Sequence, residues 1–275
     1  MSAYDSFAAA YKVFSETQLL FRSKCTFYTF FQAIGRLARS SSVLDLGCGT
    51  GHLGRECIRL GARDVFGVDG SAEQLRIAKQ FDEAEKISGI QYQQEDLSDL
   101  PVLGSFDIVA AILVMNYASD VDTLGRWLRR IYDNLAPGGI FATVMISPYW
   151  VPSEFHLLEK YGRKYIAPNG QPSKDGDPFE WMCFANGQWV QDPIQETYWS
   201  RETIEVVLKD AGYTRVRWEP IRVDPETRAS DPGYWSDIEG TRFQVCLVAE
   251  KESGGGKSEI HHHHFPLKKE EEQHN

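Results

Sequence analysis

Membrane-spanning runs, paired cysteines and metal-ligand clusters are all missing from this sequence of 275 residues. No run approaches the eighteen or so apolar residues of a membrane span, and no basic stretch followed by an apolar run opens the chain. The five cysteines are widely spaced and form no CxxC pair, which fits reduced thiols better than a disulfide framework or a zinc site. No cluster of acids shows metal-ligand spacing. These absences predict a cytoplasmic protein without a membrane partner or a metal.

Basic residues are also in the minority, since 29 Lys and Arg stand against 39 Asp and Glu, for a net charge of −10. Non-specific binding of nucleic acid needs a basic face, so we expect no nucleic-acid partner. The function classes that remain are enzymes that act on small molecules and proteins that bind them. The oligomeric state does not follow from composition.

The stretch that organises the chain is Val43–Gly51, in which an apolar run ends in Asp45 and the glycines Gly47, Gly49 and Gly51 follow. Glycines at this spacing allow a sharp turn and bring a ligand against main-chain N–H groups. A helical pattern begins at His52, and its N-terminus adds oriented donors. The stretch predicts a strand, a glycine loop and a helix that together cradle an anionic or zwitterionic group.

Strands alternate with helices after this point, which predicts βαβ units and a parallel sheet. Strands are expected at 43–46, 65–68, 90–93, 106–112 and 140–146, with two more near 213–219 and 243–250, and helices at 15–37, 52–60, 72–84, 120–134 and 201–211. The expected organisation is an N-terminal helical cap (1–40), a nucleotide-binding core (41–147), an insertion (148–200), the rest of the core sheet (201–250) and a disordered tail (251–275).

Acidic residues stand where two of these strands end. Asp69, some eighteen residues beyond the glycines, suits the paired hydroxyls of a ribose, and Asp96 suits an exocyclic amine. Both could instead be helix caps, because Asp and Ser favour that position.

The expected insertion has many aromatic residues among prolines and glycines, and the pattern predicts irregular structure. A long insertion of this kind in an α/β domain is usually a lid or a binding element. Candidate acceptor-binding residues, from this stretch and from the one after the fourth strand, are Tyr117, Tyr149, Trp150, Phe155 and Trp181.

The sequence Val43–Gly51 resembles the first motif of class I S-adenosylmethionine (SAM) dependent methyltransferases. Four further motifs follow in that family's order and spacing: Val-Phe-Gly-Val-Asp-Gly-Ser, Glu-Asp-Leu, Phe-Asp-Ile-Val and Asn-Leu-Ala-Pro-Gly-Gly-Ile-Phe. The resemblance implies an α/β, Rossmann-like fold with a seven-stranded, mostly parallel sheet, helices on both faces and a helical lid. It also implies SAM as cofactor, S-adenosylhomocysteine (SAH) as product and a small-molecule acceptor.

The same resemblance assigns roles to individual residues. Asp45, Gly47 and Gly51 would border the methionine part of SAM, Asp69 would hold the ribose and Asp96 the adenine amine, and the Leu113 carbonyl would lie near the amino group. Gln74 stands where many members place an apolar residue near the adenine. The remaining expected contacts are Cys48, Gly49, Gly70, Ser71 and Leu97.

Three short stretches narrow the resemblance, namely Tyr-Asp-x-Phe-Ala-x-x-Tyr near the N-terminus, Met-Asn-Tyr-Ala and Gly-Tyr-Trp. They look like toxoflavin-synthase-type enzymes, which act on small secondary metabolites, and similar fungal enzymes methylate dithiol natural products. In that subgroup Tyr11 would reach SAM. The N-terminal pattern is also that of an ordinary amphipathic helix.

Three other functions remain open. The string Gly49–Gly54 also satisfies GxGxxG and would fit a nicotinamide-dependent oxidoreductase, although no Tyr-x-x-x-Lys pair occurs to relay protons. The chain could instead bind SAM without catalysis, or methylate a phenol or acid oxygen.

No compelling general base is visible. His156 in the insertion is the one histidine outside the tail that does not adjoin the glycine loop, and it is a weak candidate. Methyl transfer needs alignment and exclusion of water, and it needs a base only if the acceptor must lose a proton. The hypothesis is therefore proximity catalysis on a soft nucleophile, sulfur or heteroaromatic nitrogen.

Overall fold

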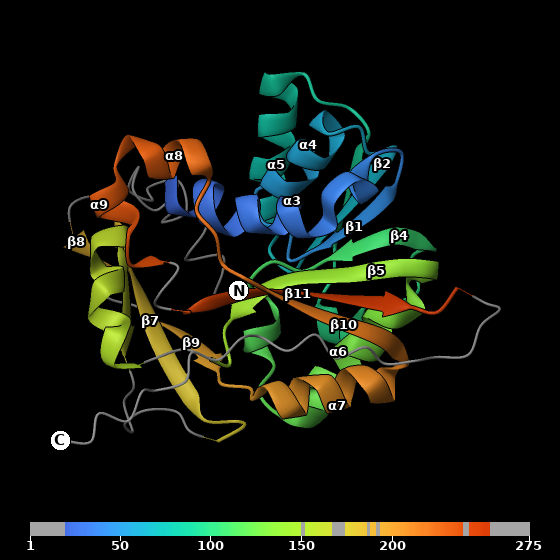
Figure 1. Ribbon diagram of the computed structural model, residues 1–275. Helices are drawn as coiled ribbons and strands as arrows, with labels where there is room; N and C mark the ends of the chain where they lie inside the picture. Colours follow the sequence, from blue (N-terminus) through green and yellow to red (C-terminus); the bar gives the residue numbers. More distant parts are fainter. Residues whose placement is uncertain are drawn as a thin grey trace.

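The computed structural model describes residues 20–149, 152–166, 174–185, 188–190, 193–238 and 242–253. Its main element is a seven-stranded sheet in the order β10-β11-β5-β4-β1-β2-β3 (Figure 1). The strands are β1 (Ser42–Leu46), β2 (Asp64–Asp69), β3 (Ile90–Gln94), β4 (Phe106–Ala110), β5 (Leu135–Ile146), β10 (Tyr213–Pro220) and β11 (Gln244–Lys251). All neighbours pair in parallel except β11, which is antiparallel to both β5 and β10. The expected fold class is thus confirmed.

Helices cover both faces of this sheet (Figure 1). On one face α3 (Tyr28–Ile34) and α4 (His52–Arg59) pack over β1, β4 and β5, and on the other α6 (Val121–Asp133) and α7 (Arg201–Ala211) do so. The helix α5 (Ala72–Glu85) contacts β2 and β3. The run Ser-Val-Leu-Asp-Leu of β1 is apolar apart from its first residue and the acid near its end, as is typical of a central strand that is buried along its whole length.

Three boundaries differ from the sequence-based expectation. The fifth strand was expected at 140–146, but β5 begins at Leu135, which already pairs with Phe106 before a register shift. The fourth strand was expected at 106–112, but β4 ends at Ala110, because the chain turns at Leu113, which has a positive φ. The expected helix at 15–37 is described from Leu20 onward, as a π-helical turn, η1 (Arg22–Phe27), then α3, then a 3₁₀ turn, η2 (Gly35–Ala38).

The described part of the insertion is regular, so the expectation of irregular structure is wrong there. After a 3₁₀ segment, η5 (Pro152–Tyr161), come β6 (Arg163–Ile166), β7 (Pro178–Ala185), β8 (Gln188–Trp189) and β9 (Ile194–Thr197). They form a small antiparallel sheet in which β7 pairs with the other three. Phe179, Trp181 and Cys183 alternate on one buried face, a two-residue period that the surrounding prolines and glycines obscured.

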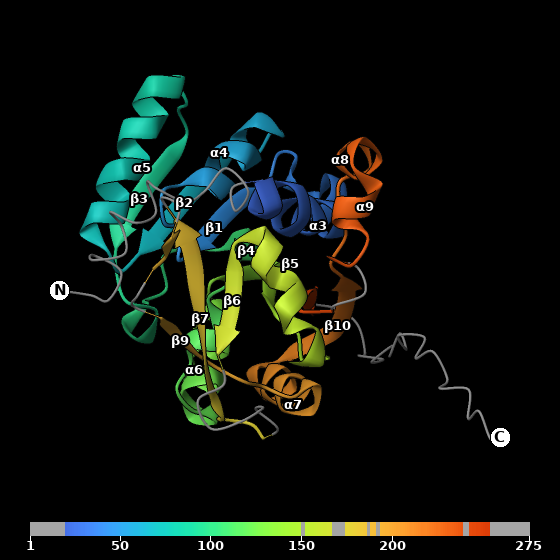
Figure 2. The same cartoon turned by 90° about the vertical axis from the view of Figure 1, so that its left-hand side faces the viewer.

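The small sheet lies at the side of the molecule toward which β5 runs, and Figure 2 shows it from that side with β6 and β7 in front of the main sheet. Two short helices that the sequence analysis did not predict, α8 (Pro225–Ser230) and α9 (Pro232–Trp235), pack near it. Each begins with an Asp cap followed by proline, a start signal that was present in the sequence. Within the described ranges, no helix has the length and apolar character to cross a bilayer.

Candidate active site

A cavity of about 270 Å³ lies between the carboxyl ends of the central strands and the small sheet. The main sheet changes direction of strand order between β1 and β4, and in open α/β sheets ligands bind in the crevice beside such a point. The wall is built from the segments after β1, β2, β3 and β4, from η1, from α6 and from the inner face of β6 and β7.

The glycine loop forms the wall after β1. Gly47 and Gly49 line the cavity and have φ of +65° and +54°, a conformation that side chains with a Cβ rarely adopt. A Cβ on Gly47 would lie 2.6 Å from Val114 Cγ2. A Cβ on Gly49 would meet only Gln74 Oε1, at 3.9 Å, and would stand at the open wall. Gly51 is placed otherwise, since a Cβ there would collide with the Tyr92 hydroxyl behind the loop.

Asp69 ends β2 and holds the glycine loop. Its Oδ2 accepts a hydrogen bond from the Gly49 amide (2.8 Å) and its Oδ1 accepts one from the Ser71 amide (2.9 Å). Ser71 caps α5 by accepting from the Gln74 amide. Gly70, Ser71 and Gln74 all line the cavity beside Asp69. Each carboxylate oxygen has a second lone pair, so the turn role and a ligand role are compatible.

A second acidic segment follows β3. Asp96 caps the short turn η3 (Leu97–Asp99), with Oδ1 accepting from the Ser98 amide at 2.7 Å. Asp96 and Leu97 line the cavity, and so does Glu95, which the sequence analysis did not single out. With Asp69, three carboxylates therefore face one end of the cavity.

Two of the expected contacts lie behind the wall. Asp45 and Cys48 are buried and are not among the residues that line the cavity. Burial raises the pKa of Asp45 to about 8, an effect that the charge of Asp69 reinforces and that of Arg22 opposes. Its Oδ2 has no hydrogen-bond partner in the part of the chain that the structure describes. Burial also raises the pKa of the Cys48 thiol.

The segment after β4 turns into the cavity at Leu113. Leu113 has φ of +57°, unusual for a side chain with a Cβ, and its amide donates to the Val144 carbonyl at 2.7 Å. Ile112, Leu113, Val114 and Tyr117 follow one another along the wall. β4 stops at Ala110, but the amides of Ala111 and Leu113 still donate to β5, and Val114 then packs against Gly47 in the glycine loop.

The opposite end of the cavity is aromatic and cationic. Tyr117 and Trp181, expected from the sequence, line it together with Arg163 and Cys183. Trp127 lines the cavity beside the acidic segment, since its Nε1 donates to Ser98 Oγ at 3.2 Å. The Arg163 guanidinium carbon lies 5.3 Å from the ring centroid of Trp181, at a distance typical of a cation–π contact. The sequence analysis missed Arg163 and Cys183, although the alternation along β6 and β7 was the available signal.

Arg22, from η1, also lines the cavity, and its charge acts on Asp45 and on His52. The sequence analysis expected the helix that carries it to cover the cleft but did not single out the arginine.

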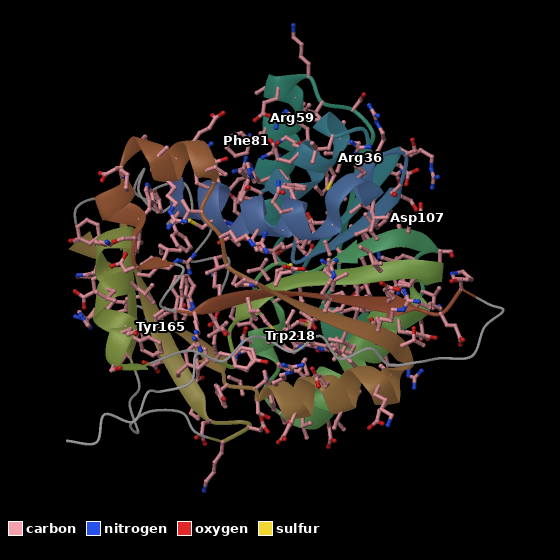
Figure 3. The ribbon with its side chains drawn as sticks, viewed as in Figure 1. Arg36, Arg59, Phe81, Asp107, Tyr165 and Trp218 are labelled. Atoms are coloured by element: carbon pink, nitrogen blue, oxygen red, sulfur yellow. The ribbon has the colours of Figure 1, made fainter. Side chains whose placement is uncertain are left out.

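Other expected contacts lie elsewhere or outside the described residues. Tyr149 contacts the ring of Trp218 on β10, and Phe155 contacts Tyr165 on β6, and neither lines the cavity; Figure 3 marks the positions of Trp218 and Tyr165. His156 is exposed, with Nδ1 3.0 Å from the Ser153 carbonyl oxygen, and it does not line the cavity either. Tyr11 and Trp150 lie outside the described residues. The described residues contain no group of three or more His, Cys, Asp or Glu that could hold a metal ion.

Comparisons with known proteins agree with this geometry. Residues 43–139 match the model of a methyltransferase domain. Over 108 residues the chain is 38% identical to a ubiquinone biosynthesis O-methyltransferase from Nitrobacter winogradskyi, which covers 39% of this chain and 40% of that protein. The chain therefore spans about two fifths of the length of that relative. Over 197 residues it is 26% identical to the N-demethylindolmycin N-methyltransferase from Streptomyces griseus, with 70% of this chain and 77% of that protein covered.

Solved structures resemble the whole fold. A SAM-dependent methyltransferase from Clostridium acetobutylicum superposes with a TM-score of 0.60 at 18% identity, covering 91% of this chain and 100% of that one. At this identity the likeness concerns the fold. Residues 43–139 are therefore similar to a methyltransferase domain, and the seven-stranded sheet has the fold of SAM-dependent methyltransferases of known structure.

Proposed function

We propose that this chain transfers the methyl group of SAM to a small, ring-containing metabolite, at a thiol or a heteroaromatic nitrogen. The observation that carries the proposal is that one cavity joins an acidic, glycine-walled end to an aromatic end. A cofactor and an acceptor could therefore meet in a cavity that the small sheet helps to wall.

The residues at the acidic end fit SAM. Gly49 leaves open space where a side chain would stand, and the Asp69 carboxylate, which can accept several hydrogen bonds, lies beside it and suits ribose hydroxyls. Asp96 is placed to accept from an adenine amine, and Gln74 Oε1, buried without a partner among the described residues, offers a further acceptor. When bound, SAM would supply a sulfonium-activated methyl group. The chain's own contribution would be to align the acceptor and to exclude water.

The aromatic end limits the acceptor. Tyr117 and Trp181 present ring surfaces there, and the volume suits a small molecule. The relatives named above include both an O- and an N-methyltransferase, so a phenol is the second acceptor class.

Turnover with an acceptor panel tests the proposal. The purified full chain would be incubated with SAM and with thiols, N-heterocycles and phenols, while SAH and methylated product are measured. We expect SAH to appear only with an acceptor, and we expect Trp181→Leu to raise the acceptor KM. The matched variant Trp189→Leu, on β8 and outside the cavity wall, should leave that KM unchanged. Binding of SAM without turnover of any acceptor would instead support a non-catalytic SAM-binding protein.

A further inference from the structure

The inner face of the small sheet holds an acid that neither the motifs nor the cavity wall accounts for. Across β6, β7 and β9, Arg163 pairs with Cys183, and Phe179 pairs with Glu196. Residues that pair directly, and those two apart on one strand, point to the same face of a sheet. Glu196 therefore shares a face with Arg163, Trp181 and Cys183, which line the cavity.

Glu196 is buried deeply for a carboxylic acid. Only 3% of it is exposed, and its Oε2 has no hydrogen-bond partner in the described part of the chain. A buried, incompletely paired carboxyl group is costly to a fold, by about 1–3 kcal/mol for a single unsatisfied polar group. A glutamine or an apolar residue would fill this position at less cost, so the carboxyl group itself calls for a role.

Tyr117 connects Glu196 to the cavity. Tyr117 lines the cavity, and as a hydrogen-bond donor its side chain lowers the pKa of the Glu196 carboxyl group. The neighbouring pair fixes this arrangement, because the Asn116 side-chain amide donates to the Thr197 carbonyl at 3.0 Å, and Asn116 Oδ1 accepts from the Ile146 amide at 2.9 Å. The turn η4 (Met115–Tyr117) is thereby held against both β9 and β5.

We propose that Tyr117 and Glu196 form a relay that removes the proton of the methyl acceptor. The inference rests on the proposed function. It favours a phenol or a ring N–H as the acceptor, because these groups must lose a proton, whereas an ionised thiol needs no base. It also replaces base-free catalysis with general-base catalysis through a residue outside the cofactor motifs.

The proton balance is simple. The acceptor's proton passes to the Tyr117 oxygen while the Tyr117 proton passes to the Glu196 carboxylate. The acceptor heteroatom keeps the electron pair and forms the bond to the methyl carbon, and the pair of the broken sulfur–methyl bond stays on sulfur. The carboxylic acid then returns its proton to water before the next turnover.

The charged and titratable groups around Glu196 suit this task. Burial raises the pKa of Glu196 to about 7, while the charge of Arg163 from β6 and the neighbouring Trp181 and Tyr117 side chains oppose the rise. Tyr165, also from β6, faces the same group, and burial raises its own pKa, so it stays neutral. A base with a pKa near the working pH transfers protons efficiently in both directions.

The first test needs no acceptor. In the SAH-bound full chain labelled with ¹³C at glutamate carboxyl groups, a pH titration followed by NMR should show one resonance with a midpoint near 7. It should be absent in Glu196→Gln and present in Glu180→Gln, which alters the neighbouring strand position on the outer face of the same sheet. Tyr117→Phe should move the midpoint upward, because it removes a donor that lowers this pKa. No titration near 7, or an unmoved midpoint in Tyr117→Phe, would overturn the relay.

The second test uses a phenol that the acceptor panel shows to be methylated and the thiophenol of the same skeleton. Glu196→Gln should lower kcat for the phenol about 100-fold, remove the rise of kcat with pH and leave SAM affinity unchanged, whereas kcat for the ionised thiophenol should change little. An equal loss for both acceptors would mean a structural role and would overturn the relay. Failure of SAM to bind, or of every acceptor to react, would instead count against the proposed function, and the carboxyl titration would still decide whether the dyad exists.

Discussion

Alanine substitutions at Gly49 and Gly35 separate the effect of backbone strain on stability from the effect of a new side chain on ligand binding. Gly49 and Gly35 have nearly the same φ, +54° and +55°, and an added Cβ would meet nothing closer than 3.9 Å at either position. Alanine is strained at both positions, because φ is positive at each and Gly35 also has ψ of −134°. We expect each Gly→Ala variant to lose roughly 1–3 kcal/mol of stability. For a chain of this size the melting temperature should fall by roughly 2–12 °C in each.

The two variants should differ in cofactor binding. Only Gly49 lines the cavity, so only its new methyl group would stand where SAM approaches the loop. We expect Gly49→Ala to weaken SAH binding at least about tenfold, which corresponds to about 1.4 kcal/mol, and Gly35→Ala to leave it unchanged. Calorimetric titration with SAH at a temperature where both variants are folded gives the comparison. Equal affinities in the two variants would refute the assignment of the cofactor to this wall.

Four further outcomes follow. Because its folded pKa of about 7 lies above the ordinary value of 4.5, Glu196 stabilises the fold below pH 4.5 relative to higher pH. On the order of 3 kcal/mol should be lost as the pH rises to 7, and Glu196→Gln should abolish that loss in urea unfolding. Asp45, with its pKa raised to about 8, is mostly protonated at pH 7, so affinity for the cationic SAM should rise from pH 6 to 8 by calorimetry, and Asp45→Asn should flatten the rise. His156→Ala should leave turnover of any panel acceptor within about twofold, because His156 is exposed and outside the cavity wall. Arg55→Met should lower the free energy of unfolding, measured in urea, by about 3 kcal/mol. The Asp82 carboxylate would lose its buried partner, because Arg55 Nη1 lies 3.1 Å from Asp82 Oδ1 in the native protein.

The alternation of strands and helices along the chain could be predicted from the sequence because its determinants are local. The run before Gly47 is apolar, the glycines come at the strand end, and Asp69 follows the second strand at the expected spacing. Short-range patterns of this kind decide both the βαβ rhythm and the cofactor wall. For the same reason Gly47, Gly49, Asp69, Asp96 and their neighbours could be selected before any coordinates.

The acceptor side could not be predicted in this way. Arg163 and Glu196 are 33 positions apart in the sequence, and only the pairing of β6, β7 and β9 brings them to one face. Without knowledge of that pairing, the aromatic residues of the insertion were the one feature of the sequence that indicated an acceptor site. Trp181 does line the cavity, whereas Tyr149 packs on Trp218 instead. The proposed base, Glu196, acts through Tyr117, and no sequence motif links these two residues.

The central claim is that the cavity after β1 and β2 holds SAM. The most direct test is calorimetric titration of two variants that alter opposite ends of β2. Asp69 ends β2 at the cavity, and Asp64 begins the same strand at the exposed far end. We predict that SAM binds the purified chain with one-to-one stoichiometry, that NADH does not bind, that Asp69→Ala abolishes SAM binding and that Asp64→Ala preserves it. Binding of NADH without SAM, or full SAM affinity in Asp69→Ala, would contradict the account.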